Sequence, residues 1–116
     1  MPGNSNGPGF VYIIQMLLNH KHAAGKNTVY KIGQTKNIRT RANSIHNSWD
    51  CPVKVVAYAF SKNPRQLERA ILDYSEKYRC HFPVMLEYFP HTIEYRIFTA
   101  SQLQDVIQKL FENSYP

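Results

Sequence analysis

A chain of 116 residues is long enough for one compact domain with a single hydrophobic core. Hydrophobic residues make up 43% of it, which argues against disorder, and no apolar run approaches the roughly 20 residues that span a bilayer. Residues 1–9 are rich in Gly and Pro and lack the apolar stretch of a secretory signal. We therefore expect an intracellular protein, in a cytoplasm or a host nucleus, with a flexible arm (1–9) and one domain (10–116).

The net charge of +6 is unevenly distributed. Residues 50–116 contain eight basic and eight acidic side chains, whereas residues 1–49 contain no Asp or Glu. The basic side chains of this first part are Lys21, Lys26, Lys31, Lys36, Arg39 and Arg41. A segment of one sign attracts polyanions such as DNA. A solvated basic surface without a nucleic-acid partner is the alternative.

The chain opens with a predicted β-hairpin. Phe10–Leu18 and Thr28–Gly33 are rich in β-branched and aromatic residues, and the polar stretch between them reads as a loop. Side chains alternate between the faces of a strand. Two pairs therefore each share a face: Tyr12 with Ile14, and Lys31 with Gly33.

Three helices and two further strands follow. Asn37 and Asn63-Pro64 are N-terminal signals of helices, and a last helix begins near Thr99–Ser101. Pro52–Phe60 and Glu94–Phe98 are predicted strands. The helices carry apolar stripes, which comprise Ile38, Ala42 and Ile45; Leu67, Ala70, Ile71, Tyr74 and Tyr78; and Leu103, Val106, Ile107, Leu110 and Phe111. The order β-β-α-β-α-β-α predicts an α/β fold with a small, mixed but largely antiparallel sheet flanked by helices.

The cysteine and histidine pattern argues against a zinc site. Cys51 and Cys80 are too few for a disulfide framework, and we expect reduced thiols. The chain has no Cys-x-x-Cys pair, and the adjacent Cys80 and His81 have poor spacing for structural zinc.

Short motifs in this order resemble the GIY-YIG nuclease superfamily. Val11-Tyr12-Ile13 and the later segment Tyr30–Arg41 (YKIGQTKNIRTR) are similar to its paired motifs. Gln66–Ile71 (QLERAI) resembles the family helix that carries a metal-binding glutamate. Asn47–Phe60 and Thr92–Phe98 resemble the small phage- and virus-type branch. The resemblance covers roughly residues 10–100, and the shared order and spacing make it specific.

The resemblance implies a metal-dependent endonuclease that hydrolyses phosphodiester bonds in DNA, with Mg²⁺ or Mn²⁺ as cofactor. Tyr12 would be the general base or would position the attacking water, and Arg41 would stabilise the phosphorane. Glu68, which lies beside the buried stripe of its helix, would be the single protein ligand of the metal. Without the resemblance these residues read as a core aromatic, a solvated arginine and an exposed glutamate.

The chain departs from the family pattern in both motifs, since Phe10-Val11 precede Tyr12 where the first motif has Gly and Ile, and the hairpin between the motifs is longer than the family minimum. Lys31 stands where the superfamily usually has a tyrosine, and Tyr30, one place earlier, turns to the opposite face of the strand. The ammonium group of Lys31 would contact a phosphate or lower the pKa of Tyr12. His46, five residues after Arg41, is a further candidate for the site, with a surface histidine at a helix end as the alternative.

The resemblance implies DNA as the partner and no membrane. Lys21, Lys26, Lys36 and Arg39 are candidates for contacts with phosphates, and Trp49 would stack on a base or anchor a turn. We expect weak sequence specificity unless a targeting partner or a second copy of the chain supplies it. A catalytically silent DNA-binding module and a protein-interaction domain with a basic face are the two rivals.

Overall fold

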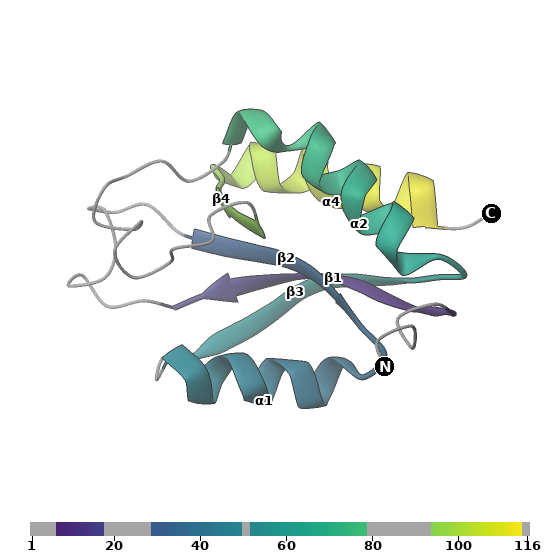
Figure 1. The fold of residues 1–116 in the computed structure, drawn as a ribbon. Helices are drawn as coiled ribbons and strands as arrows, with labels where there is room; N and C mark the ends of the chain where they lie inside the picture. Colours follow the sequence, from purple (N-terminus) through teal and green to yellow (C-terminus); the bar gives the residue numbers. More distant parts are fainter. Residues whose placement is uncertain (1–6, 18–28, 50–51, 79–93, 115–116) are drawn as a thin grey trace.

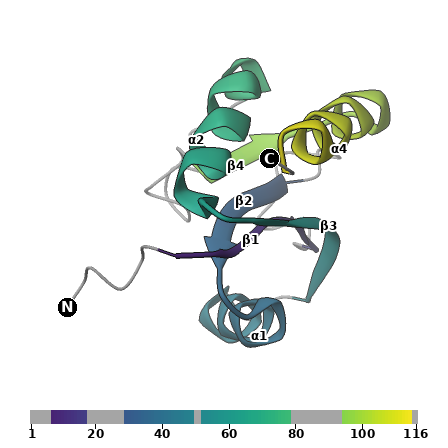
Figure 2. The same cartoon turned by 90° about the vertical axis from the view of Figure 1, so that its right-hand side faces the viewer.

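The computed structural model describes residues 7–17, 29–49, 52–78 and 94–114, including the backbone but not the side chain of Trp49. A four-stranded sheet forms the middle layer, in the order β3-β1-β2-β4, and every described pair is antiparallel. The strands are β1 (Gly9–Met16), β2 (Val29–Thr35), β3 (Val53–Ser61) and β4 (Tyr95–Ile97). Helix α1 (Ile38–Trp49) covers one face, and α2 (Pro64–Tyr74) and α4 (Ala100–Ser114) cover the other (Figures 1 and 2).

The predicted α/β class and element order are confirmed. Alternation along β1 separates two cores, as expected for a sheet covered on both faces. Val11 and Ile13 pack with residues of α2 and α4, whereas Ile14 packs with residues of α1. Tyr12 and Ile14 share the α1 face, and Tyr30 lies on the opposite face, as the period of two predicts.

The predicted helix starts are confirmed by their caps. The side chain of Asn37 accepts a hydrogen bond from the backbone N–H of Thr40 (2.9 Å), and that of Asn63 accepts one from Gln66 (3.3 Å). Thr99 and Gln102 cap α4 reciprocally. These contacts satisfy N–H groups that lack a partner within the helix.

The apolar stripes are narrower than predicted. Ala70 and Phe111 are exposed, and Tyr78 follows α2 in a short 3-10 turn (Glu76–Tyr78) instead of continuing it. Each helix packs on the sheet over a limited arc, so apolar residues at the margin of a stripe stay in solvent.

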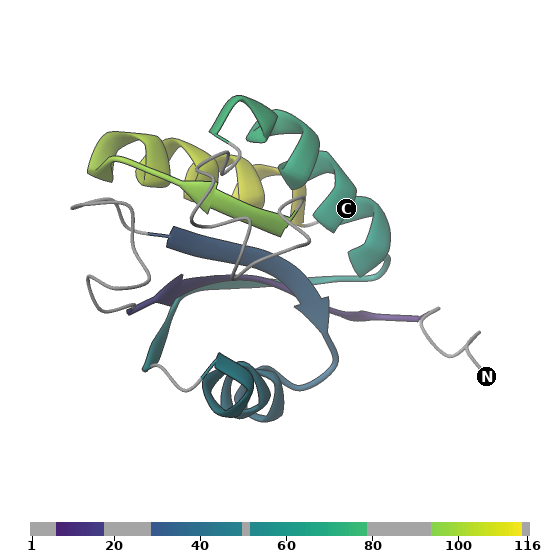
Figure 3. The ribbon, with the colours of Figure 1, turned by 60° about the vertical axis from the view of Figure 1, so that its left-hand side comes forward.

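The short β4 leaves half of β2 without a neighbouring strand on that side. β4 pairs only with Val29–Lys31, so among the described residues Ile32–Thr35 form an open sheet edge. Figure 3 views this side of the molecule, with α2 above β2 and α1 below it. Side chains from both helix layers can therefore reach the same edge.

Some predictions fall outside the described residues. Lys21, Lys26, both cysteines and every histidine except His46 belong to this group, as does most of the predicted arm. No helix among the described residues is long and apolar enough to cross a membrane.

Candidate active site at the open edge of the sheet

Gly33 makes room for the ring of Tyr12. The two residues are partners in the β1–β2 register. A Cβ atom at Gly33 would lie 2.6 Å from Cζ of Tyr12 and closer still to its hydroxyl oxygen. The ring therefore lies across the backbone of β2, pointing from β1 toward the open edge, and only 1% of Tyr12 is exposed. Gly33, in the later motif segment, thus positions Tyr12, the tyrosine of the first motif.

Charged side chains from three parts of the fold act electrostatically on Tyr12. Burial raises the pKa of Tyr12 far above its ordinary value. The positive charge of Arg41 opposes that rise, whereas the negative charges of Glu94 and Glu68 add to it. These side chains belong to α1, to α2 and to the residue just before β4, and Coulomb interactions of this kind weaken with distance. The hydroxyl is therefore protonated at neutral pH in the metal-free protein.

Glu68 is half-buried and fixed by a neighbour from the sheet. Its Oε1 accepts a hydrogen bond from Nε2 of Gln34, at 2.8 Å. Burial raises the pKa of Glu68, Glu94 raises it further, and the Gln34 hydrogen bond, Lys31 and Arg41 lower it. Sequence reasoning missed Gln34. Gln34 follows Ile32 by two residues, so the alternation of side chains along a strand places both on the α2 face of β2. That alternation is the sequence signal that would have identified Gln34.

Lys31 is also held in place. Its ammonium group forms an ion pair with Glu94 and lies 5.5 Å from the ring centroid of Tyr95, its cross-strand partner. The lysine side chain is 13% exposed and shares the sheet face of Tyr12. This ion pair gives Glu94 a structural role, because it fixes the positive charge of Lys31 on the sheet face that carries Tyr12.

The other predicted residues lie on or beside α1. Arg41 is exposed in its second turn, and Lys36 and Arg39 are exposed around its start. His46 is exposed in the last turn, about 140° round the helix axis from Arg41. The side chain of Trp49 is outside the described part.

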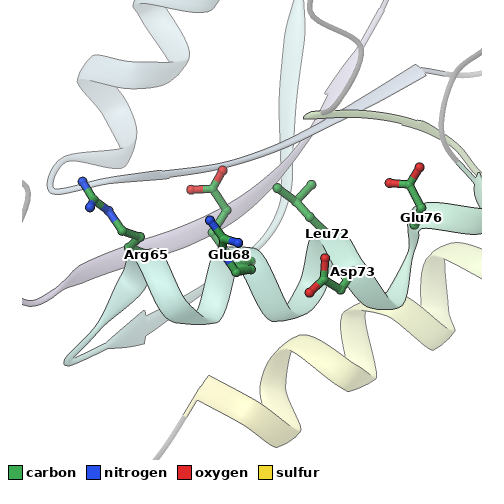
Figure 4. A pocket seen from close by; sticks show the side chains of 6 residues that line it. Arg65, Glu68, Leu72, Asp73 and Glu76 are labelled. Atoms are coloured by element: carbon green, nitrogen blue, oxygen red, sulfur yellow. The ribbon is translucent and has the colours of Figure 1, made fainter.

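A groove of about 350 Å³ runs beside α2 and reaches Glu68. In Figure 4, Arg65, Glu68 and Leu72 project from the same side of the helix, toward the strands. The lining residues are Arg65, Glu68, Arg69, Leu72, Asp73 and Glu76. Solvent and ions can therefore approach the Glu68 carboxylate.

The oxygen atoms at this edge suit a hard divalent cation. The negative charge of Glu94 acts on Glu68, whose half-buried carboxylate accepts one hydrogen bond from Gln34, and a cation would offset this repulsion. Among the described residues, no three His, Cys, Asp or Glu side chains form a metal cage. Mg²⁺ typically uses one or two carboxylates and keeps several water ligands. The donor set therefore fits Mg²⁺ or Mn²⁺.

Comparison with known proteins identifies the family. The model of the T5orf172 domain matches residues 9–111, which span β1 to most of α4 and so include the whole site. The chain belongs to the T5orf172 domain family. T5orf172 domains occur in phage-derived nuclease-like proteins. No curated protein and no solved structure matches the chain significantly.

Proposed function

We propose that this T5orf172 domain is a metal-dependent endonuclease of the GIY-YIG type, which hydrolyses phosphodiester bonds in DNA. The convergence of Tyr12, Lys31, Arg41 and Glu68 from four elements carries the proposal. A buried tyrosine, a lysine held by an ion pair, an exposed arginine and a half-buried carboxylate exceed what packing alone requires. The membership in a family of nuclease-like proteins supports the same activity.

The residues divide the work of hydrolysis. The water oxygen attacks phosphorus, and the bond to the leaving 3′-oxygen breaks. Because the Tyr12 hydroxyl is protonated at neutral pH, it orients the attacking water by hydrogen bonding and does not start as a phenolate. The exposed guanidinium of Arg41 can meet the phosphate and stabilise the charge that develops on it.

Lys31 and the acidic side chains complete the site. Lys31, held by Glu94, places a second positive charge on the Tyr12 face, where it can contact a phosphate oxygen. Glu68 would hold Mg²⁺ or Mn²⁺, and a bound ion supplies positive charge for the leaving oxygen. Gln34 orients the Glu68 carboxylate by its hydrogen bond.

Plasmid nicking tests the proposal. We would incubate supercoiled plasmid with the protein in Mg²⁺, in Mn²⁺ and in EDTA. Glu68→Gln, Arg41→Ala and Tyr12→Phe should each lower the nicking rate by about 10²- to 10³-fold, because each removes a group that stabilises or positions the reacting atoms. Glu112→Gln, on the exposed side of α4, is the matched control and should cut like the wild type.

Two other experimental outcomes would favour a different function for this domain. Lys31 in place of the usual tyrosine favours the silent DNA-binding module as the second candidate. That module would shift DNA in a gel at low salt and cut it with neither metal. A protein-interaction domain would bind no DNA at moderate salt.

A further inference from the structure

Three aromatic side chains form an exposed cluster on the sheet, and we call Phe10, Tyr58 and Phe60 the aromatic cluster. The ring of Phe10 meets that of Tyr58 edge-on at 5.9 Å between centroids, and that of Phe60 at 5.6 Å. Tyr58 and Phe60 are each 53% exposed. Large apolar side chains usually leave solvent when a chain folds, so an ordered group of rings kept in solvent suggests a ligand.

The aromatic cluster lies on the same sheet face as Tyr12, on the β1–β3 side and not at the open edge of β2. Tyr58 is the cross-strand partner of Tyr12, and Phe60 is the partner of Phe10, so all three rings lie on the sheet face that carries Tyr12. The α1 core on this face includes Val53 and Val55 of β3 but neither Tyr58 nor Phe60. The rings therefore lie at the uncovered end of the face, two of them on edge strand β3 and Phe10 on the neighbouring β1.

Basic residues are close in sequence or in strand register to these rings. The segments around the aromatic cluster, residues 7–12, 34–41 and 58–66, contain no Asp or Glu. Their basic residues are Lys36, Arg39, Arg41, Lys62 and Arg65. The ammonium group of Lys36 lies beside Gly7, just before the start of β1. Exposed rings with basic residues in the neighbouring segments complement a nucleic-acid strand. The phosphates of the strand can pair with the positive charges while its bases stack on the rings.

Stacking on such rings requires a base outside the double helix. In a duplex the faces of each base are covered by its neighbours, whereas a single-stranded segment can present them. We propose that the aromatic cluster binds unpaired bases next to the phosphate to be cut, so that the substrate class is DNA with a single-stranded segment, such as a flap or branch. This proposal rests on the nuclease function proposed above.

Binding in EDTA tests the aromatic cluster without any cutting. We would measure the affinity of the protein for a fluorescent single-stranded 12-mer and for the matching blunt duplex. Tyr58→Ala and Phe60→Ala should each weaken single-strand binding by about 5- to 100-fold, by analogy with other stacking surfaces. Duplex binding should change less than about twofold, because phosphate contacts dominate it. Phe60→Trp should retain single-strand affinity.

Phe111→Ala is the matched control. Phe111 is 52% exposed, and it lies on α4, across the sheet from the aromatic cluster. The control should bind both DNAs like the wild type. A 2-aminopurine base in the 12-mer adds a direct readout, since its fluorescence should be quenched by the wild type and much less by Tyr58→Ala/Phe60→Ala.

Three outcomes would overturn the inference: unchanged single-strand affinity, equal losses for single strand and duplex, or a loss of self-association with no change in DNA binding. The last would assign the rings to a second copy of the chain. Failure of the nuclease proposal is distinguishable. Wild-type protein would then nick no plasmid, while the dependence of single-strand binding on the aromatic cluster would persist.

Discussion

Tyr12 combines two demands that usually conflict in one side chain. Its ring belongs to the core beneath the sheet, and its hydroxyl sits among the charged groups of the open edge. The bare backbone of Gly33 reconciles them, because any Cβ there would occupy the space of the ring. The glycine is required by a close approach of side chain to backbone rather than by a turn.

Gly33→Ala should therefore displace the Tyr12 ring. We expect a loss of about 1–3 kcal/mol in the free energy of unfolding, the usual cost of overpacking, and a loss of nicking. Urea unfolding of the single and double variants with Tyr12→Leu measures the coupling. In the Tyr12→Leu background the added methyl group should cost much less. Equal costs in both backgrounds would show that the ring is not the obstacle.

A second feature at the scale of single residues is Glu68, whose ionised form is disfavoured by burial. Its folded-state pKa is raised, chiefly by burial, so the neutral form is favoured in the fold. The associated stability is present below the unfolded-state pKa and is lost as pH rises through the folded-state pKa. At neutral pH, without metal, the ionised carboxylate thus lowers the free energy of unfolding.

Glu68→Gln should be more stable than the wild type in EDTA at pH 7. The amide stays neutral and can still accept the hydrogen bond of Gln34. Urea unfolding should show the difference shrinking as pH falls toward the acidic range. Added Mg²⁺ should stabilise the wild type and not the variant. A variant less stable than the wild type at pH 7 would contradict this account.

At the scale of elements, a buried arginine fixes the end of α2. Arg96, fully buried in β4, donates to the hydroxyl of Ser75 and to the carbonyl of Leu72, both at 2.9 Å. Nη2 also lies 3.5 Å from a carboxylate oxygen of Glu76. Carbonyls at the end of a helix lack partners within it and attract cations. Arg96 therefore joins the helix that carries Glu68 to the strand beside Lys31.

Arg96→Met should destabilise the protein strongly. Removal of the guanidinium leaves buried acceptors without donors, and we expect a loss of about 2–4 kcal/mol in the free energy of unfolding. Arg69→Met, on the exposed surface of α2, is the control, with a change within about 0.5 kcal/mol. Thermal and urea unfolding of both variants measure this. A small effect of Arg96→Met would show that α2 keeps its end without the arginine.

Local sequence patterns predicted the helices and strands well, but they did not predict the contacts between these elements. Alternation along β1 and β2, and the caps at Asn37 and Asn63, depend on neighbours in sequence, and the structure confirms them. The burial of Arg96 was not predictable, because an arginine in a short strand usually reads as exposed. Long-range partners, such as Gln34 with Glu68, depend on how the layers stack.

The roles of the site residues stay predictions. The motif order indicated which elements carry Tyr12, Arg41 and Glu68. In the structure, Arg41 and Glu68 both act electrostatically on Tyr12. The pairing of Lys31 with Glu94 could not be read from the sequence, because nothing local links the two positions. The exposure of Tyr58 and Phe60 was hidden for a related reason. Apart from Lys54 and Ser61 their strand is apolar, whereas α1 covers only part of its length.

At the scale of the molecule, the described part of the chain exposes basic side chains around the start of α1 and in the β3–α2 turn. Lys36, Arg39 and Lys62 are all exposed there. If this surface meets phosphates, each contact releases counterions from the DNA. Affinity for duplex DNA should then fall steeply as salt rises.

Lys36→Ala and Arg39→Ala should each reduce the slope of log K against log salt concentration by about 1. Lys77→Ala is the control, since Lys77 is exposed beyond the end of α2 and stacks on Tyr74 and Tyr78. Titrations of a labelled duplex at several salt concentrations give the slopes. Unchanged slopes in both variants would move the phosphate contacts to another face.

The ion pair between Lys31 and Glu94 joins positions 63 residues apart. Residue 31 leaves the ribosome many seconds before residue 94, since synthesis adds about 5–20 residues per second and residues between them must also emerge. Until β4 docks, the lysine beside Tyr12 lacks the partner that holds it. If the protein cuts DNA as proposed, a chain in which this later segment has not folded would lack the ion pair that holds Lys31 on the Tyr12 face, and we expect full activity only once that pair has formed.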